Sequence, residues 1–250
     1  MKIYITKRFI ITAIIAIPVI IAGYFIIDYK YDKYIINNTI DTYNTIKDAY
    51  AKTIKTANYQ WEDGKIDTES FSKEFIKNLP VKKDCAFKGT DCFPLDMHSN
   101  YTTTVVPPSL GIYDMSYYKV MLENNVGLAI KISSPTCSEL NNSCGTIVMD
   151  VNSKKIGPNM FSRDLFDVGI YKDKIDLYSL EGNMYPNCMC GGGQFCTAFV
   201  VKFKSRDYKK FPEYEKEYKL QFVNHTRYPR GERFLRKNVR NNILNETCFN

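Results

Sequence analysis

Histidine is almost absent from this chain of 250 residues, which has only His98 and His225. No HExxH, GxSxG or P-loop pattern occurs either, which excludes the commonest metalloprotease, serine-hydrolase and nucleotide-binding sites. The three glycines at positions 191–193 are not followed by Lys-Ser/Thr, and Cys190 and Cys196 flank them, so a tight disulfide loop is favoured over an anion cradle. We therefore predict no catalytic residue, no cofactor and no small-molecule substrate.

Internal repeats are absent as well. Hydrophobic residues make up 44% of the chain and aromatic residues 14%, which excludes a disordered protein because so much apolar surface favours burial. The length suits one domain of ordinary size with an anchor, or two small domains, and a single core is the simplest expectation.

Cysteine is missing from the first 84 residues and then occurs eight times. An even number of cysteines that all follow an apolar N-terminus predicts a disulfide set in an oxidising compartment. A zinc site is the alternative, but the cluster at positions 188, 190 and 196 lacks the two CxxC pairs of a zinc ribbon, so no metal site is predicted. The spacing favours disulfides between Cys85 and Cys92 and between Cys137 and Cys144. Cys196 is expected to pair with either Cys188 or Cys190, and Cys248 with whichever of those two remains.

Charged residues are missing from residues 9–27, an apolar run of 19 residues. At about 1.5 Å per residue, a helix of this length crosses a hydrocarbon core of about 30 Å. No small-x-small cleavage site ends the run, so we expect an uncleaved anchor in the lipid bilayer. Lys2, Lys7 and Arg8 precede it, which by the positive-inside rule places the N-terminus in the cytoplasm. The sequence thus predicts a single-pass protein whose C-terminal domain is extracytoplasmic, in the periplasm or at the cell surface.

Basic residues are concentrated near the C-terminus. The net charge is +7, and residues 204–250 hold 12 Lys and Arg against 6 Asp and Glu. Behind a membrane anchor, such a segment is typical of a solvated face or of a contact with an acidic surface. We expect no nucleic-acid partner.

Helical and strand patterns follow each other along the chain. Apolar residues recur every three or four positions after the anchor, with no Gly or Pro before Gly64, which predicts one helix from about residue 3 to residue 58. A short capped helix is predicted at residues 67–79, before Pro80, and a loop at 86–116. Alternating β-branched and aromatic residues then predict an antiparallel sheet with strands at 117–122, 126–133, 146–151, 166–171 and 197–203.

These elements divide the chain into three parts. Residues 1–33 form the cytoplasmic tip and transmembrane anchor, and residues 34–203 form a stem and globular domain. Residues 204–250 form a basic C-terminal extension, in which residues 231–244 are a candidate helix.

A longer motif runs from Cys144 through Asp150-Val151-Asn152 and Gly157-Pro158-Asn159 to Arg163-Asp164-Leu165-Phe166. It resembles the D-V-N-G…P-N…G-x-D-x-F pattern of type IV pilin-like proteins, including the pseudopilins of type II secretion. In that family the pattern marks a strand, a turn and the next strand. The similarity covers about residues 1–200, since the layout of anchor, stem and small sheet is shared. By their chemistry, Asp150 and Asn152 are expected to bond local backbone, Pro158 to fix φ, and Asp164 to cap the following turn.

The resemblance implies an α+β fold in which a long N-terminal helix, transmembrane in one half and an amphipathic stem in the other, packs on a disulfide-stapled antiparallel β-sheet. It also implies a non-catalytic structural or accessory subunit of a type IV pilus or a type II secretion pseudopilus. Its partners are then other pilin-like subunits or secretion-machinery proteins. The chain departs from the family at its start, where it lacks the prepilin-peptidase glycine and the glutamate that follows it, and has Lys7 and Arg8 at apolar positions. It is therefore expected to be a divergent minor component or a non-assembling relative.

Two alternatives stay open. Hard oxygen ligands suit Ca²⁺, and some pseudopilins bind it, so Asp150, Asn152 and Asp164 could form a calcium site, although three side chains are too few for a full shell. The other alternative is a type II membrane protein whose disulfide-bonded ectodomain binds a partner at the cell or virion surface. It is favoured by the Asn-x-Ser/Thr sequons that begin at Asn37, Asn100, Asn141, Asn224 and Asn245.

Overall fold

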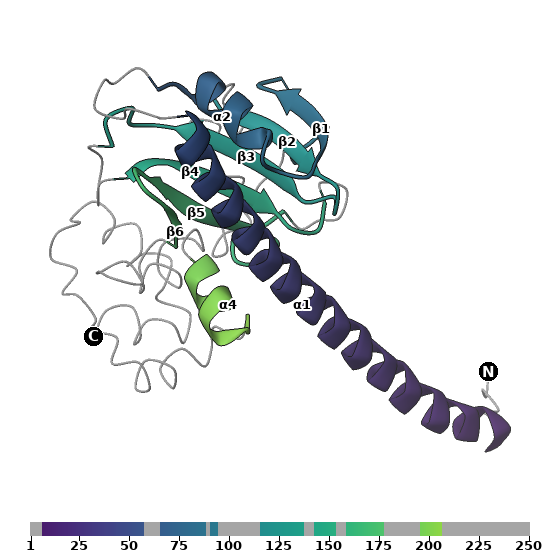
Figure 1. Ribbon diagram of the computed structural model, residues 1–250. Helices are drawn as coiled ribbons and strands as arrows, with labels where there is room; N and C mark the ends of the chain where they lie inside the picture. Colours follow the sequence, from purple (N-terminus) through teal and green to yellow (C-terminus); the bar gives the residue numbers. More distant parts are fainter. Residues whose placement is uncertain are drawn as a thin grey trace, which may run out of the picture.

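A long helix crosses one face of a six-stranded antiparallel sheet in the computed structural model (Figure 1). The structure describes residues 7–57, 66–88, 91–94, 116–137, 143–153, 159–177 and 196–206. Within these ranges, the side chains of residues 7–16, 20, 24 and 57 lie outside the description. The candidate helix at residues 231–244 lies outside the described residues altogether.

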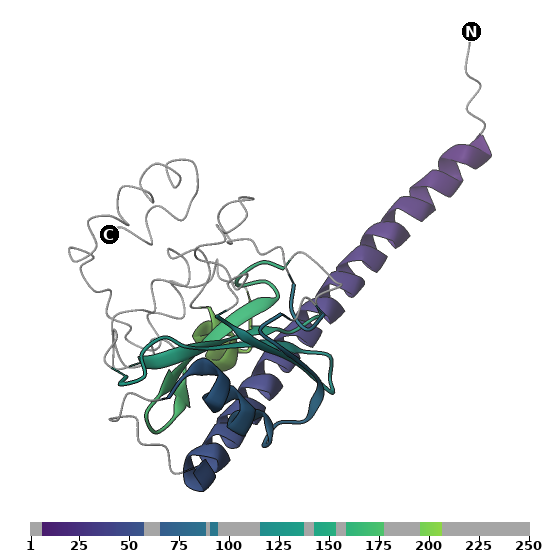
Figure 2. The same ribbon diagram turned by 90° about the horizontal axis from the view of Figure 1, so that it is seen from above.

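The long helix α1 spans Lys7–Ala57 without interruption, so the single helix predicted from the sequence is confirmed over the described residues. At about 1.5 Å per residue its 51 residues extend over about 75 Å. Only its C-terminal part packs on the sheet, while its N-terminal part projects away from the domain, as Figures 1 and 2 show from two directions. The packed face follows the helical period, with Ile35, Ile36, Thr39, Tyr43, Ile46 and Tyr50 all buried.

Helix α2 spans Thr68–Ile76 and begins as the sequence predicts. The Asp67 side chain accepts a hydrogen bond from the Ser70 backbone N–H at 2.7 Å, and the Ser70 hydroxyl faces the Asp67 N–H, which together form a capping box. Its buried Phe71 and Phe75 pack around Tyr50 of α1, with ring centroids 6.0 and 6.4 Å away. This contact fixes the C-terminal end of α1 beside α2.

The sheet is a meander whose strands follow one another in chain order. It consists of β1 (Val81–Ala86), β2 (Tyr118–Leu122), β3 (Gly127–Ile132), β4 (Ser143–Asp150), β5 (Leu165–Tyr171) and β6 (Ile175–Asp176). The sequence predicted β2 to β5 correctly. It missed β1, which has only scattered apolar residues and lies at an exposed edge with two register shifts against β2. It also missed β6, which has only two residues.

The strand predicted at residues 197–203 is wrong, because these residues form the helix α4 (Thr197–Phe203). A short apolar run does not distinguish a strand from a buried helix, and here the contacts decide. The buried Ala198, Phe199 and Val200 join the core beside α1. The Thr197 hydroxyl accepts a hydrogen bond from the Asp167 N–H at 3.0 Å and donates one to the Asp167 carbonyl at 2.6 Å. The short strand β6 pairs only with Gly169 and Ile170 of β5, so this hydroxyl satisfies the backbone groups of Asp167 in place of a neighbouring strand.

The two faces of the sheet carry cores of unequal size. The larger core lies between the sheet and the helices and includes Leu128, Met149 and Phe166. Their chain neighbours Ala129, Val148 and Leu165 point to the other face, where they form a smaller cluster with Phe93 and Phe161. Both faces are therefore covered, which explains why β3, β4 and β5 are buried along almost their whole length.

Candidate functional site

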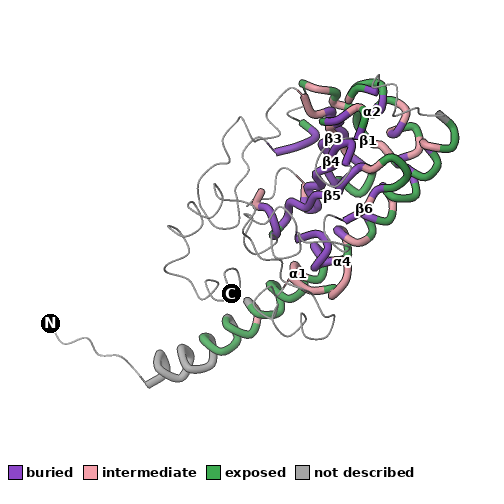
Figure 3. Tube along the Cα trace, turned by 90° about the vertical axis from the view of Figure 1, so that its left-hand side faces the viewer, coloured by how far each residue is buried: buried purple, intermediate pink, exposed green. Residues whose placement is uncertain are grey.

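The projecting end of α1 exposes large apolar side chains to solvent. Figure 3 shows the change from buried to exposed residues along the helix. Between 49% and 70% of the residue surface is exposed at Ile17, Val19, Ile21, Phe25, Ile26, Ile27 and Tyr29. These residues at positions 17–29 are called the apolar end of α1 below. Apolar surface of this extent marks contact with a membrane or with another protein.

Among the residues that the structure describes, no helix is long and apolar enough to cross a membrane. Within the predicted anchor at 9–27, the side chains of residues 9–16, 20 and 24 lie outside the described residues.

A second feature lies where the packed part of α1 begins. The connection from β4 to β5, residues 150–153 and 159–164, meets Tyr31, Asp32 and Asn38 of α1 and Arg206 beyond α4. We call this set the stem–loop junction. It contains all the described residues of the D-V-N…P-N…D motif.

Asp164 is the centre of the stem–loop junction. Its fully buried carboxylate accepts hydrogen bonds from the Met160 N–H at 2.6 Å, the Asn159 N–H at 2.9 Å and the Asn152 Nδ2 at 3.1 Å. Burial raises the pKa of Asp164, and the two backbone N–H groups act against this increase. Asp164 was expected to cap the following turn, but its carboxylate binds the residues that precede it.

Asp150, at the end of β4, is a fully buried acidic residue. It has 0% exposure, and neither of its carboxylate oxygens meets the geometric criteria for a hydrogen bond with another described residue. Burial, followed by the charge of Asp164, raises the pKa of Asp150 to about 8. The backbone N–H of Asn152 acts against this increase. The sequence predicted a local backbone bond for Asp150, and the Asn152 N–H is the local backbone group that lowers its pKa.

Three contacts tie the loop to α1. The Asn152 Nδ2 donates to the Tyr31 hydroxyl at 2.8 Å, and the Asn38 Nδ2 donates to the Val151 carbonyl at 3.0 Å. Arg206 forms an ion pair with Asp32 at 2.5 Å and also donates to the Arg163 carbonyl. Except for Arg163 and Arg206, the residues that these contacts join are more than 100 positions apart in the chain. No local pattern in the sequence could have identified them.

Two serines of the loop have a left-handed backbone. Ser153 has φ of 74° and Ser162 has φ of 69°, a region that favours glycine because a Cβ atom is strained there. Both serines stand where the pilin-like pattern D-V-N-G…G-x-D has glycine. At both positions the loop therefore has the positive φ that a glycine, as in the family pattern, would adopt without strain.

Replacing Ser153 by glycine is expected to stabilise the protein by about 0.5–1 kcal/mol, because the strain at positive φ is removed and outweighs the greater freedom of the unfolded chain. The measurement is the midpoint of chemical denaturation. Ser133→Gly is the control, since Ser133 is not among the residues of positive φ, and it should lower stability or leave it unchanged. A lower midpoint for Ser153→Gly than for the unmodified protein would contradict the expectation.

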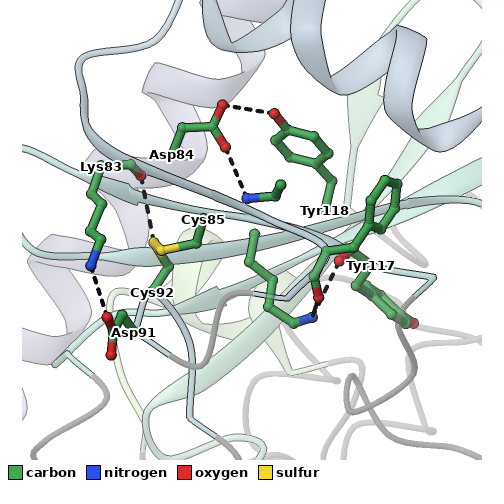
Figure 4. The surroundings of a disulfide bond; sticks show 10 residues. Lys83, Asp84, Cys85, Asp91, Cys92, Tyr117 and Tyr118 are labelled. Carbon is green, nitrogen blue, oxygen red and sulfur yellow. Dashed lines mark hydrogen bonds and ion pairs between the residues drawn. A yellow bond between two sulfur atoms is a disulfide. The ribbon is translucent and has the colours of Figure 1, made fainter.

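The two local disulfides predicted from the sequence are confirmed. Cys85–Cys92 and Cys137–Cys144 are bonded, and Figure 4 shows the first of them. There Cys85 of β1 is joined to Cys92, with the Lys83–Asp91 ion pair of 2.9 Å alongside and Asp84 accepting from the Tyr118 hydroxyl at 2.7 Å. Cys196 is disulfide-bonded too. Cys188, Cys190 and Cys248 lie outside the described residues.

The other residues that the sequence singled out are placed as follows. His98, His225, Pro158 and the glycines at 191–193 lie outside the described residues. No group of three or more His, Cys, Asp or Glu side chains that could hold a metal occurs among the described residues. Of the sequons, only Asn37 is described. It is exposed, but Thr39 of that sequon is 0% exposed within α1 and its hydroxyl donates to the Ile35 carbonyl.

The structure thus offers two sites. They are the apolar end of α1, which exposes large apolar side chains, and the stem–loop junction, which joins α1 to the loop between β4 and β5. The chain matches no protein-family model, no curated protein and no solved structure.

Proposed function

We propose that this protein is a membrane-anchored, non-catalytic subunit of pilin-like architecture, which serves a type IV pilus or a type II secretion pseudopilus as a structural or accessory component. The carrying observation is the helix α1, which is packed on a sheet at one end and presents apolar side chains at the other. The uncharged run at residues 9–27 would lie in the bilayer or against the same helix of neighbouring subunits. The sheet and its disulfides would form the extracytoplasmic surface.

Two features of the domain support this proposal. The meander sheet covered by one long helix is the arrangement that the resemblance implies. In addition, the family's glycine positions coincide with Ser153 and Ser162, the two serines of positive φ in the loop. A chance sequence match would not be expected to align with the backbone in this way.

The proposal is tested by fractionating cells that produce the full-length chain. The unmodified protein should stay in the membrane pellet after an alkaline carbonate wash. Replacing both Ile17 and Ile21, which are 56% and 49% exposed, by lysine should release it, since each lysine near the centre of a membrane helix costs about 2.5–3.5 kcal/mol. Recovery of the unmodified protein in the soluble fraction would contradict the anchor.

A matched control places two lysines at exposed positions on the packed part of α1, Asn37→Lys with Asn44→Lys, and should leave the protein in the membrane. Mechanical shearing of intact cells then separates the two functions. Release of the chain together with other pilin-like proteins would support the filament subunit. Retention in the membrane under conditions that remove the filaments would favour the anchored ectodomain.

A further inference from the structure

Basic residues from three parts of the chain meet where α1 leaves the domain. They lie on α1 itself, on the loop before β5 and just after α4, which packs beside α1 (Figure 3). Arg206 joins the three parts, because its guanidinium forms an ion pair with Asp32 of α1 at 2.5 Å and donates to the Arg163 carbonyl. We call this set the basic collar, and it consists of Lys30, Lys33, Arg163, Lys204 and Arg206.

The basic collar carries an excess of positive charge at the surface. Every member except Arg206 is exposed. The acidic residues of α1 between positions 28 and 40 are Asp28 and Asp32, and Asp32 is already paired with Arg206. The other acidic residues of the stem–loop junction are fully buried. The basic C-terminal extension begins at the same place, and its residues 227–240 contain six Lys and Arg against one acidic residue. This end of the domain therefore favours an anionic partner.

The basic collar lies at the depth of lipid headgroups when residues 9–27 span a bilayer, so this inference rests on the anchor proposed above. Lys30 and Lys33 follow Ile27 by three and six residues, which corresponds to about 4.5 and 9 Å along a helix. The headgroup layer on each side of the hydrocarbon core is about 5–7 Å thick, and a lysine side chain reaches several ångströms back toward it. Because a bilayer surrounds a spanning helix, basic residues on any side of α1 at this level face headgroups.

We propose that the basic collar binds the anionic headgroups of phospholipids in the leaflet from which α1 emerges. Each Lys or Arg close to an anionic membrane surface contributes about 1 kcal/mol to such a contact. The partner is a lipid surface and not an acidic protein, because the collar directly follows the exposed apolar side chains of residues 17–29. A membrane presents an apolar layer and then an anionic layer in this order along the helix. The contact would hold the domain against the bilayer.

The test measures which lipids contact the full-length chain in a bilayer. The protein is reconstituted in phosphatidylcholine vesicles that contain a trace of spin-labelled phosphatidylcholine or phosphatidylglycerol, and electron paramagnetic resonance gives the immobilised fraction of each label. At low salt the unmodified protein should select phosphatidylglycerol about two- to five-fold. Adding 0.5 M NaCl should remove most of this selectivity, because the Debye length falls to about 4 Å.

Reversing two charges of the basic collar, with Lys30→Glu and Lys33→Glu, should at least halve the selectivity. The basic residues that precede the anchor face the opposite leaflet and account for what remains. The matched control is Lys52→Glu with Lys55→Glu, which has the same spacing at exposed positions of the same helix, about 37 Å or more from the end of the anchor. The control should keep the full selectivity. Equal selectivity in the collar variant and the control would overturn the proposal.

A second variant tests the part of the basic collar that lies outside α1. Arg163→Gln removes one of the exposed charges but keeps the contact with Arg206, which binds the backbone carbonyl of residue 163. It should lower the selectivity by roughly a quarter. Lys172→Gln is the control, since Lys172 is exposed just after the other end of β5, and it should change nothing. Equal selectivities of these two variants would contradict a collar that includes the loop.

Failure of the anchor gives a different result from failure of the lipid contact. If neither spin label is immobilised by the unmodified protein, residues 9–27 do not lie in the bilayer, and the proposed function fails together with this inference. If both labels are immobilised and the collar variants behave as their controls do, the anchor stands and the headgroup contact alone is overturned.

Discussion

Replacing Ile46 by aspartate is expected to lower the free energy of unfolding by about 4 kcal/mol or more. Ile46 is 0% exposed and lies on the face of α1 that packs in the main core. The change removes the burial of an isoleucine and places a carboxylate in the apolar core, and each of these effects alone costs several kcal/mol. A domain with a typical total stability of about 5–15 kcal/mol would be largely or partly unfolded at growth temperature.

The measurement is thermal unfolding of the full-length chain, followed by near-ultraviolet circular dichroism. Asn44→Asp is the matched control, because it introduces the same carboxylate two residues earlier, at an exposed position of the same helix. The control should melt within a few degrees of the unmodified protein. If Ile46→Asp melted together with the control, α1 would not be an integral part of the domain.

The described helices α1 and α2 and the strands β2 to β5 could be predicted because each has its own local signal. Helix α1 shows a period of three to four, α2 has the Asp67 cap, and the central strands are rich in β-branched residues. The disulfides Cys85–Cys92 and Cys137–Cys144 were equally local, since each encloses a short loop in the chain. In all these cases the information lies within about ten neighbouring residues.

The elements that were missed or wrong depend on distant contacts. The β1 sequence VKKDCA has no alternating apolar pattern, and it becomes a strand because β2 supplies hydrogen-bonding partners from more than 30 residues away. The residues of α4 have strand-like composition, but they fill the space between α1 and the edge of β5. Sequence periodicity contains no information about such a space.

The same distinction applies to the stem–loop junction. The sequence singled out Asp150, Asn152 and Asp164, and the structure brings Asn152 and Asp164 into contact. It could not show that Asp150 is fully buried, because this depends on how distant parts of the chain pack around the end of β4. Nor could it identify Tyr31, Asn38 and Arg206, which reach the junction from distant parts of the chain.

Replacing Asp164 by alanine is expected to destabilise the protein by about 3–5 kcal/mol. The variant leaves the N–H groups of Asn159 and Met160 without their acceptor, and the Asn152 amide keeps only the Tyr31 hydroxyl as an acceptor. Losing the charged acceptor of several inward-facing donors costs more than losing an ordinary hydrogen bond, since each stranded donor keeps its full desolvation penalty. Relief of the repulsion with Asp150 offsets only part of this loss. The measurement is chemical denaturation, with Asp173→Ala at an exposed position as the control.

Asp164→Asn separates the acceptor role of this residue from its charge. The amide keeps one oxygen acceptor and removes the repulsion with Asp150, so the stability of this variant should lie between those of the alanine variant and the unmodified protein. Because the Asn152 amide joins Asp164 to Tyr31 of α1, the alanine variant should also increase hydrogen exchange in the part of α1 around residue 31. Loss of stability without any change in exchange there would mean that the loop supports the sheet but does not hold the stem. In that case the angle of α1 would depend on the core contacts of Ile35, Ile46 and Tyr50 alone.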